Sequence, residues 1–225
     1  MLLGYGAKNC WCFKDWIDIN LRLNGYVPKD VSDNKNYSLI LGFEGANASG
    51  KTNALKVFVF IADFIKNSFI YTPESSILYD SFFNNNEPSE FYVEFEYPDE
   101  LEYRYEAILQ KDHVIKEKLI LIKSTVEEIL LQRDNNKVSI NHLYDNESKI
   151  ILRNNASIIS TLHQYAIQEI ESIYNFFNKH TINVTYTGLR YEIRRDVSAI
   201  SEVYFRNPEA LNFTKQLIKK FDTGI

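Results

Sequence analysis

The sequence contains few cysteines and no long apolar run, and both shortages exclude classes of protein. Its 225 residues include two cysteines, too few for a disulfide framework, and no histidine lies near Cys10 and Cys12 in the sequence to complete a four-ligand zinc site. The longest nearly pure apolar run, residues 57–62 with its flanks, is much shorter than the roughly 20 residues of a membrane-spanning helix. The first residues also lack a basic region that leads into an apolar stretch. We therefore expect a cytoplasmic protein without membrane association, whose two reduced thiols pack on one face of a strand.

An excess of positive charge is missing as well. Lys and Arg number 25 against 30 Asp and Glu, a net charge of −5, so the chain has no overall attraction to nucleic acids or acidic membranes. The hydrophobic share of 45% supplies ample material for a globular core, in one domain or two small ones. One local basic cluster could contact nucleic-acid phosphates, with a tyrosine available to stack on a base. Its acidic neighbours, Glu192 and Asp196, favour an ordinary solvent-exposed surface instead. The cluster comprises Arg190, Tyr191, Arg194 and Arg195.

The first 70 residues predict strands, then a loop and a long helix. Residues 2–23 interleave apolar and polar side chains as one or two strands do, and residues 24–36 are a polar loop. Residues 37–43 form a short apolar run, which is typical of a strand buried on both faces of a mainly parallel sheet. Residues 51–69 show helical spacing with apolar side chains around much of the circumference, so we expect this helix to be deeply packed.

The middle of the chain predicts an antiparallel meander with one face in water. Residues 91–97 alternate strictly, with aromatic or apolar side chains on one face and Glu94 and Glu96 on the other. The same alternation recurs after turn-forming residues, so further strands are expected at residues 103–109, 113–122, 129–132 and 137–140.

Helical spacing returns after the meander. Residues 156–177 predict one helix with a single apolar stripe, and Asn207 is a suitable cap for a last helix that ends near residue 221. We divide residues 1–225, taken as part of one domain, into a strand, loop and helix region (1–70), a β meander (71–153) and a helical region (154–225). The stripe comprises Ile159, Leu162, Ala166, Ile170, Ile173 and Phe177.

One segment carries recognisable chemistry, because it matches the phosphate-binding loop pattern G-x-x-x-x-G-K-[ST]. Two glycines let the backbone turn tightly enough for successive amide N–H groups to face one anion, and the following helix adds the positive end of its dipole. The apolar run before the loop and the helix after it are the context that the motif requires. We therefore predict a nucleotide-binding site made of Gly45, Ala46, Asn47, Ala48, Ser49, Gly50, Lys51, Thr52 and Asn53.

Two side chains of this loop have distinct predicted roles. Lys51 places a positive charge between the β- and γ-phosphates and is the one catalytic residue that the sequence predicts. The Thr52 hydroxyl is the predicted ligand of Mg²⁺. The chain contains no Asn-Lys-x-Asp element of a guanine site, which favours adenine, so the expected ligands are ATP and Mg²⁺.

The sequence of the loop, Gly-Ala-Asn-Ala-Ser-Gly-Lys-Thr-Asn, resembles that of ABC-type ATPases of the SMC, RecF and OLD group. An opening Gly-Ala-Lys-Asn-x-x-x-Phe (residues 6–13), an Asn-Glu-Pro-Ser-Glu-Phe stretch (residues 86–91) and a Tyr-Arg-Tyr strand (residues 103–105) extend the resemblance to the AAA15/OLD-like ATPases of bacterial abortive-infection and anti-phage systems. The resemblance implies an α/β P-loop NTPase fold: an ABC-type ATPase head with a mainly parallel sheet and an antiparallel β subdomain. It also implies that Asn47 contacts the γ-phosphate side of the site and that Lys8 and Asn9 lie beside the base and ribose.

The motifs for hydrolysis are absent from these 225 residues. Hydrolysis in this group needs a strand that ends in Asp-Glu, and the nearest match, which ends at Asp63, lies in the helix after the loop and continues with Phe64. A Leu-Ser-Gly-Gly-like signature is also absent. Glu44 precedes the loop, but a structural role is favoured over that of a base. The resemblance places both motifs further along, so we expect this sequence to be the N-terminal part of a larger ATPase.

The resemblance implies a function that depends on assembly. Complete members are expected to hold ATP between two heads of a homo-oligomer, to hydrolyse it, and to control an effector nuclease or toxin in anti-phage defence. Two alternatives remain open from the residues alone. One is a non-catalytic module that binds ATP or a protein partner, and the other is an SMC-like DNA clamp, which the net charge of −5 disfavours.

Overall fold

The computed structural model describes residues 1–97, 100–123, 126–135, 137–140, 150–180, 182–185, 188–189 and 197–221. The chain divides into two compact units, Met1–Leu189 and Arg190–Ile225, and each is described by itself. The first unit carries the phosphate-binding loop. The described residues of the second form two helices.

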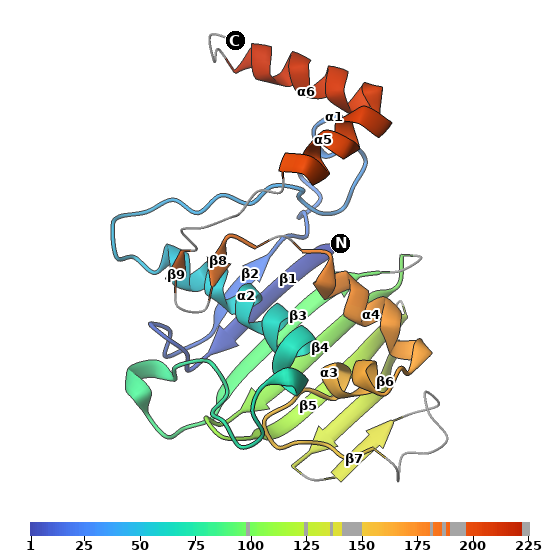
Figure 1. Cartoon of the computed structure of the whole chain (residues 1–225). Helices are drawn as coiled ribbons and strands as arrows, with labels where there is room; N and C mark the ends of the chain where they lie inside the picture. The colour runs from blue at the N-terminus through green and yellow to red at the C-terminus, as the bar shows by residue number, and fades with distance from the viewer. Residues whose placement is uncertain are drawn as a thin grey trace. The chain divides into compact units, whose positions relative to one another are not determined.

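A seven-stranded sheet forms the base of the first unit (Figure 1). Its strands lie in the order β2-β1-β3-β4-β5-β6-β7, and every pair of neighbours among the described residues is antiparallel. From β3 onward each strand pairs with the next in sequence, which is the predicted meander. The strands are β1 (Leu2–Lys8), β2 (Ile17–Asn20), β3 (Ser89–Glu96), β4 (Glu102–Leu109), β5 (Val114–Lys123), β6 (Val126–Asp134) and β7 (Lys137–Ile140).

Alternation within the strands gives the sheet one apolar and one polar face. In β3 every second side chain is buried, starting from Ser89, and β4 shows the complementary pattern. Charged side chains gather on the opposite face, where Arg104 forms ion pairs with Glu94 (2.6 Å) and Glu106 (2.7 Å). The meander and its two faces are therefore confirmed as the sequence predicted.

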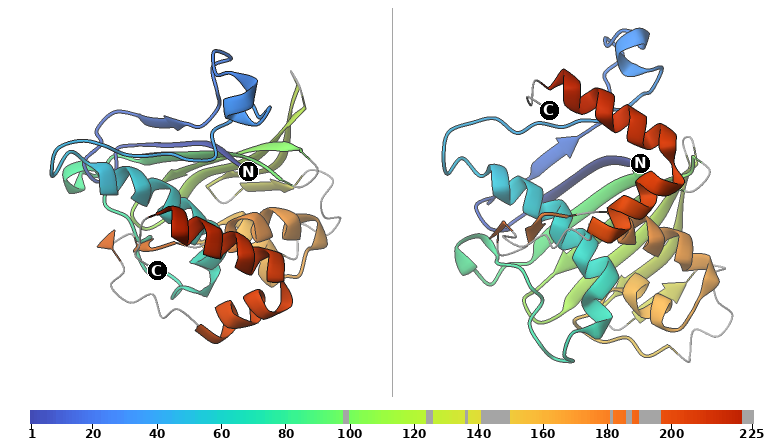
Figure 2. Two further views of the ribbon diagram at one scale, coloured as in Figure 1. Left: turned by 90° about the horizontal axis from the view of Figure 1, so that it is seen from above. Right: turned by 45° about the horizontal axis from the view of Figure 1, so that its top comes forward.

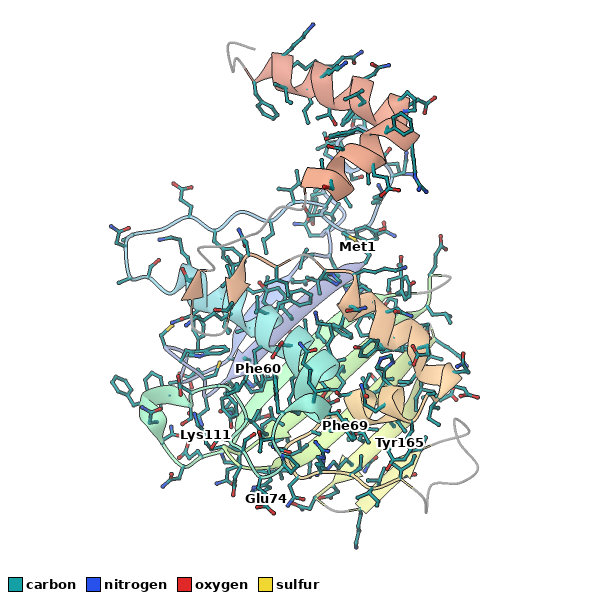
Figure 3. All side chains as sticks on the ribbon, in the orientation of Figure 1. Met1, Phe60, Phe69, Glu74, Lys111 and Tyr165 are labelled. Carbon is teal, nitrogen blue, oxygen red and sulfur yellow. The ribbon has the colours of Figure 1, made fainter. Side chains whose placement is uncertain are left out.

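Three helices cover the apolar face of the sheet, as the turned views in Figure 2 show. They are α2 (Lys51–Asn67), α3 (Ile158–Gln164) and α4 (Gln168–Asn178). Phe60 of α2, labelled in Figure 3, is 3% exposed and lies 4.7 Å from the ring of Phe91 on β3, centroid to centroid. Phe176 of α4 stacks on Phe95 at 4.5 Å. The deep packing predicted for the helix after the loop is confirmed.

A buried polar network fixes α3 to the sheet. Glu117 of β5 accepts hydrogen bonds from the hydroxyls of Tyr105 (2.8 Å) and Ser157 (2.6 Å) and from the backbone N–H of Ile158 (3.0 Å), where α3 begins. Arg133 is buried nearby and donates to the carbonyl of Ala156 at 2.9 Å. Burial raises the pKa of the Glu117 carboxyl and lowers the pKa of Arg133. The bond from Ile158 satisfies the first orphan N–H donor of the helix.

The strand predicted at residues 37–43 is wrong. The structure describes all of these residues and shows one isolated antiparallel bridge, Arg22 to Tyr37, with the rest of the segment outside any strand. Ile40 is 85% exposed and Leu39 is 59% exposed. A mainly parallel sheet has helices on both faces that bury its strands, but the described strands all pair antiparallel with one another. The mainly parallel sheet is accordingly not shown.

The prediction that both thiols pack on one strand face is also wrong. β1 ends at Lys8, and Asn9 and Trp11 adopt left-handed conformations (φ 56° and 46°) that turn the chain. Cys10 is buried and Cys12 is exposed. Burial raises the pKa of the Cys10 thiol to about 12.

The single helix predicted over residues 156–177 is two helices, α3 and α4. Ala166, one of the predicted stripe residues, is exposed and left-handed (φ 55°) where the chain turns between them. The buried residue at this break is Ile167 instead. The turn lets both short helices lay their apolar faces on the core, which explains why the remaining stripe residues are still buried.

The second unit contains α5 (Val197–Arg206) and α6 (Pro208–Lys220). The predicted cap is confirmed, because the Asn207 side chain accepts a hydrogen bond from the N–H of Ala210 (3.1 Å). The first of these helices was not predicted. Remaining short elements of the chain are α1 (Lys29–Ser32), two 3-10 turns (Ser68–Ile70 and Phe82–Asn84), β8 (Val184–Thr185) and β9 (Gly188–Leu189). Among the described residues, none of the helices is both long and apolar enough to cross a membrane.

Candidate functional site

The phosphate-binding loop lies directly before α2, which begins at Lys51. Gly50 caps this helix with φ 91°, and Gly45 has φ 152° at the other end of the loop. Both values lie where side chains are disfavoured, and a Cβ on Gly45 would come within 2.9 Å of Ser49 Oγ. The two glycines of the motif are therefore required by the backbone of this loop.

Lys51 folds back over the loop. Its Nζ donates hydrogen bonds to the carbonyl oxygens of Gly45 and Ala46, each at 2.7 Å. The ammonium group is thus held above the loop by neutral acceptors, which an anionic ligand can replace with stronger, charge-assisted bonds. The contact of Lys51 with bound phosphates stays a prediction.

The start of α2 is open to an anion. In its described first turn no acidic side chain neutralises the positive end of the helix dipole. Ala46, Asn47, Ala48 and Ser49 are exposed, as is Thr52, while Asn53 is half-buried. The loop and Thr52 are therefore accessible from solvent.

The turn after β1 supports the loop from the side. A Cβ on Gly50 would lie 3.1 Å from Cys12 Sγ and 3.6 Å from the ring of Phe13. The contact shows a second reason for glycine at this position, which is the close approach of a neighbouring segment. The positions of Cys12 and Phe13 in the sequence do not predict that they lie against Gly50.

Lys8 and Asn9, predicted to lie beside the base and ribose, have other partners in the structure. Lys8 forms an ion pair with Glu90 at 3.1 Å. The Asn9 side-chain amide donates to the carbonyls of Glu87 (2.9 Å) and Pro88 (3.1 Å) and exchanges hydrogen bonds with Asn85 (3.0 and 2.8 Å). These bonds give Asn9 a structural role in holding residues 85–89, and its contact with a nucleotide stays a prediction.

Asp63 and Glu44, the two carboxylates weighed from the sequence as catalytic groups, lie in different places, one near the end of α2 and the other before the loop. Asp63 lies on α2 and accepts hydrogen bonds from Asn67 (2.7 Å) and from the Tyr71 hydroxyl, so it stabilises the end of the helix. Glu44 is exposed beside the loop. Across the described part of the chain, no group of three or more His, Cys, Asp and Glu side chains is arranged to hold a metal ion. The basic cluster at residues 190–195 lies outside the described residues.

One family model matches most of the chain. It is described as an AAA domain, putative AbiEii toxin, type IV toxin–antitoxin system, and it matches residues 40–224. The match includes the phosphate-binding loop, strands β3 to β9 and the helices from α2 to α6, while β1 and β2 lie before it. Neither the comparison with curated proteins nor the comparison with solved structures gives a match.

Proposed function

The chain belongs to the AAA domain family of putative AbiEii toxins of type IV toxin–antitoxin systems, and on this premise we propose that residues 45–53 bind the triphosphate of ATP together with Mg²⁺. Membership of an AAA family related to abortive-infection systems implies nucleotide binding. The observation that carries the assignment to this loop is Lys51, whose ammonium is held over an exposed loop at the start of α2.

The roles of the loop residues follow from their positions. Backbone N–H groups of residues 46–50 would surround the phosphates, and Lys51 would exchange its two carbonyl partners for phosphate oxygens. Thr52 lies one residue further into the helix, where its hydroxyl is exposed and would bind Mg²⁺. Asn47 is exposed at the middle of the loop and would contact the γ-phosphate side.

Hydrolysis requires a carboxylate to activate water, and we propose that this group comes from outside the described residues. Asp63 accepts hydrogen bonds from Asn67 and Tyr71, and Glu44 is exposed beside the loop. This supports the finer assignment to the AAA15/OLD-like ATPases, in which two heads hold ATP between them and each completes the other's site. ATP-driven dimerisation would then control an effector nuclease or toxin in anti-phage defence.

A change of Lys51 to Ala tests the binding proposal. Removal of a charge partner from a phosphate should weaken binding of ATP with Mg²⁺ by roughly 30-fold or more, measured by titration calorimetry. Lys66→Ala is the matched control, because Lys66 lies near the other end of the same helix, away from the loop. Equal affinities of the Lys51 variant and the unchanged protein would contradict the proposal.

A second candidate function is nucleotide binding without turnover. Asp63, the nearest match to a catalytic strand carboxylate, lies on α2 and is hydrogen-bonded to Asn67, which favours this role for the chain on its own. Phosphate release measured at saturating ATP distinguishes binding alone from ATP hydrolysis. Release that continues over many turnovers, and stops in the Lys51→Ala variant, would contradict a purely binding role.

A further inference from the structure

A groove lies beside the phosphate-binding loop, and its walls come from three separate segments. α2 contributes Asn53 and Lys56, the turn after β1 contributes Trp11, and the turn before β3 contributes Phe82, Phe83 and Asn84. Asn53 and Lys56 are three residues apart and so lie on one face of the helix, immediately after the loop. The groove therefore begins where the phosphate-binding residues end.

The size and chemistry of the groove suit a planar ligand with polar edges. Its volume is about 680 Å³, within the range of roughly 300–1,000 Å³ that small-molecule sites occupy. Trp11 is half-buried, with its ring edge-on to Phe60 at 6.2 Å and Lys56 Nζ 5.7 Å from its centroid. A large indole is thus anchored in the core on one side and lines the groove on another.

The two aromatic walls are tied to each other. The backbone N–H of Trp11 donates to the carbonyl of Asp80 at 2.8 Å, so the turn after β1 holds the turn before β3. Asp80 also pairs with Lys111 (3.0 Å), which Figure 3 labels. Two backbone hydrogen bonds, from Trp11 to Asp80 and from Phe82 to Asn9 (3.4 Å), therefore join the segment of the indole to the segment of the Phe82–Asn84 turn.

Phe83 is the least expected residue of the groove. It is 85% exposed and left-handed (φ 50°), as is Asn84 (φ 53°). A bulky aromatic residue in this conformation is an outlier that costs free energy, and its ring gains little burial in return. Phe82 packs against it edge-on at 4.5 Å and limits where the ring can point.

We propose that this groove holds the base of the nucleotide, with Phe83 as a stacking residue opposite Trp11 and the Asn53 and Asn84 amides at the edge of the base. The inference rests on the proposed binding of the triphosphate at residues 45–53, since the groove begins at Asn53. Base–aromatic stacking and amide hydrogen bonds together recognise a nucleobase, whereas the phosphate loop alone recognises any polyphosphate.

The test compares MgATP with inorganic tripolyphosphate plus Mg²⁺, which lacks a base. Phe83→Ala should weaken MgATP binding roughly 5- to 150-fold and leave tripolyphosphate binding unchanged. Phe83→Tyr keeps the ring and should restore most of the loss. Tyr26→Ala, which removes an aromatic ring that is 89% exposed and lies outside the groove, is the matched control. Unchanged MgATP affinity in Phe83→Ala, or an equal loss for both ligands, would overturn the stacking role.

A fluorescence measurement tests the opposite wall without disturbing it. The chain has two tryptophans, so Trp16→Phe leaves Trp11 as the single indole reporter. MgATP should quench this emission because a base stacks on the ring, and tripolyphosphate should not. Quenching by neither ligand, while both bind, would contradict the proposal. Lys51→Ala should weaken both ligands; if it weakens neither, the triphosphate assignment fails, whatever Phe83→Ala does to MgATP.

Discussion

Two apolar segments flank the phosphate-binding loop, and they differ in how they meet the rest of the molecule. Residues 57–65 of α2 are mostly buried, against strands on one side and against α3 and α4 on another. Residues 39–41 before the loop are exposed, although their composition is just as apolar. Phe60 is 3% exposed and Ile40 is 85% exposed. Composition therefore sets the tendency to be buried, while an available apolar surface decides whether burial occurs.

The largest expected loss of stability comes from a change in the buried segment, residues 57–65 of α2. Phe60→Ala removes a ring that touches Trp11, Phe64, Tyr79 and Phe91, and the cavity left behind should lower the free energy of unfolding by about 3–5 kcal/mol. Urea denaturation followed by circular dichroism measures it. Phe213→Ala in the second unit, where the ring is 66% exposed, is the control and should change little. A loss below about 1 kcal/mol for Phe60→Ala would contradict the packing of α2.

The sequence predicted the elements whose pattern is local. The alternation in β3 and β4 and the helical spacing in α2 needed no distant information, because each element shows its own buried face. It could not predict that residues 37–43 stay outside the sheet, since that depends on which strands are present as neighbours. The break at Ala166 was missed for a related reason, because two short helices on one surface give the same stripe as one long helix.

The candidate site also has one part that the sequence predicts, the loop, and one part that it does not, the groove. The loop at residues 45–53 follows from its own spacing and from the helix after it. The groove does not, because Trp11, Lys56 and Phe83 are far apart in sequence and meet through the turn after β1. Asn is a residue type that favours positive φ, but the positive φ at Trp11, which completes this turn, has no signal in residue type. Asn9 was singled out by resemblance, and the structure adds that its amide bonds hold the turn before β3.

A smaller loss of stability is expected from a change at Asn9, in the turn after β1, which contacts the turn before β3. Asn9→Ala would remove four hydrogen bonds that the buried Asn9 side chain makes to residues 85–88, which are exposed, and would place Ala in a left-handed conformation. The free energy of unfolding should fall by about 1–3 kcal/mol. The exposed Asn86→Ala is the matched control, and thermal unfolding of both variants measures the difference. Equal stability of the two variants would show that the Asn9 amide does not hold the turn.

The smallest expected effect on stability is in the exposed apolar segment before the loop, residues 39–41. It tests whether this segment is exposed or buried in solution. Ile40→Ser replaces a side chain that is 85% exposed, so the free energy of unfolding should change by less than about 0.5 kcal/mol. If the segment were instead a strand buried on both faces, the same change would remove a fully buried side chain and cost about 1.5–3 kcal/mol or more. Urea denaturation at two protein concentrations distinguishes these outcomes. A large loss that grows with protein concentration would mean that residues 39–43 are covered when copies of the chain associate, and the contrast with α2 would then hold for the separate chain alone.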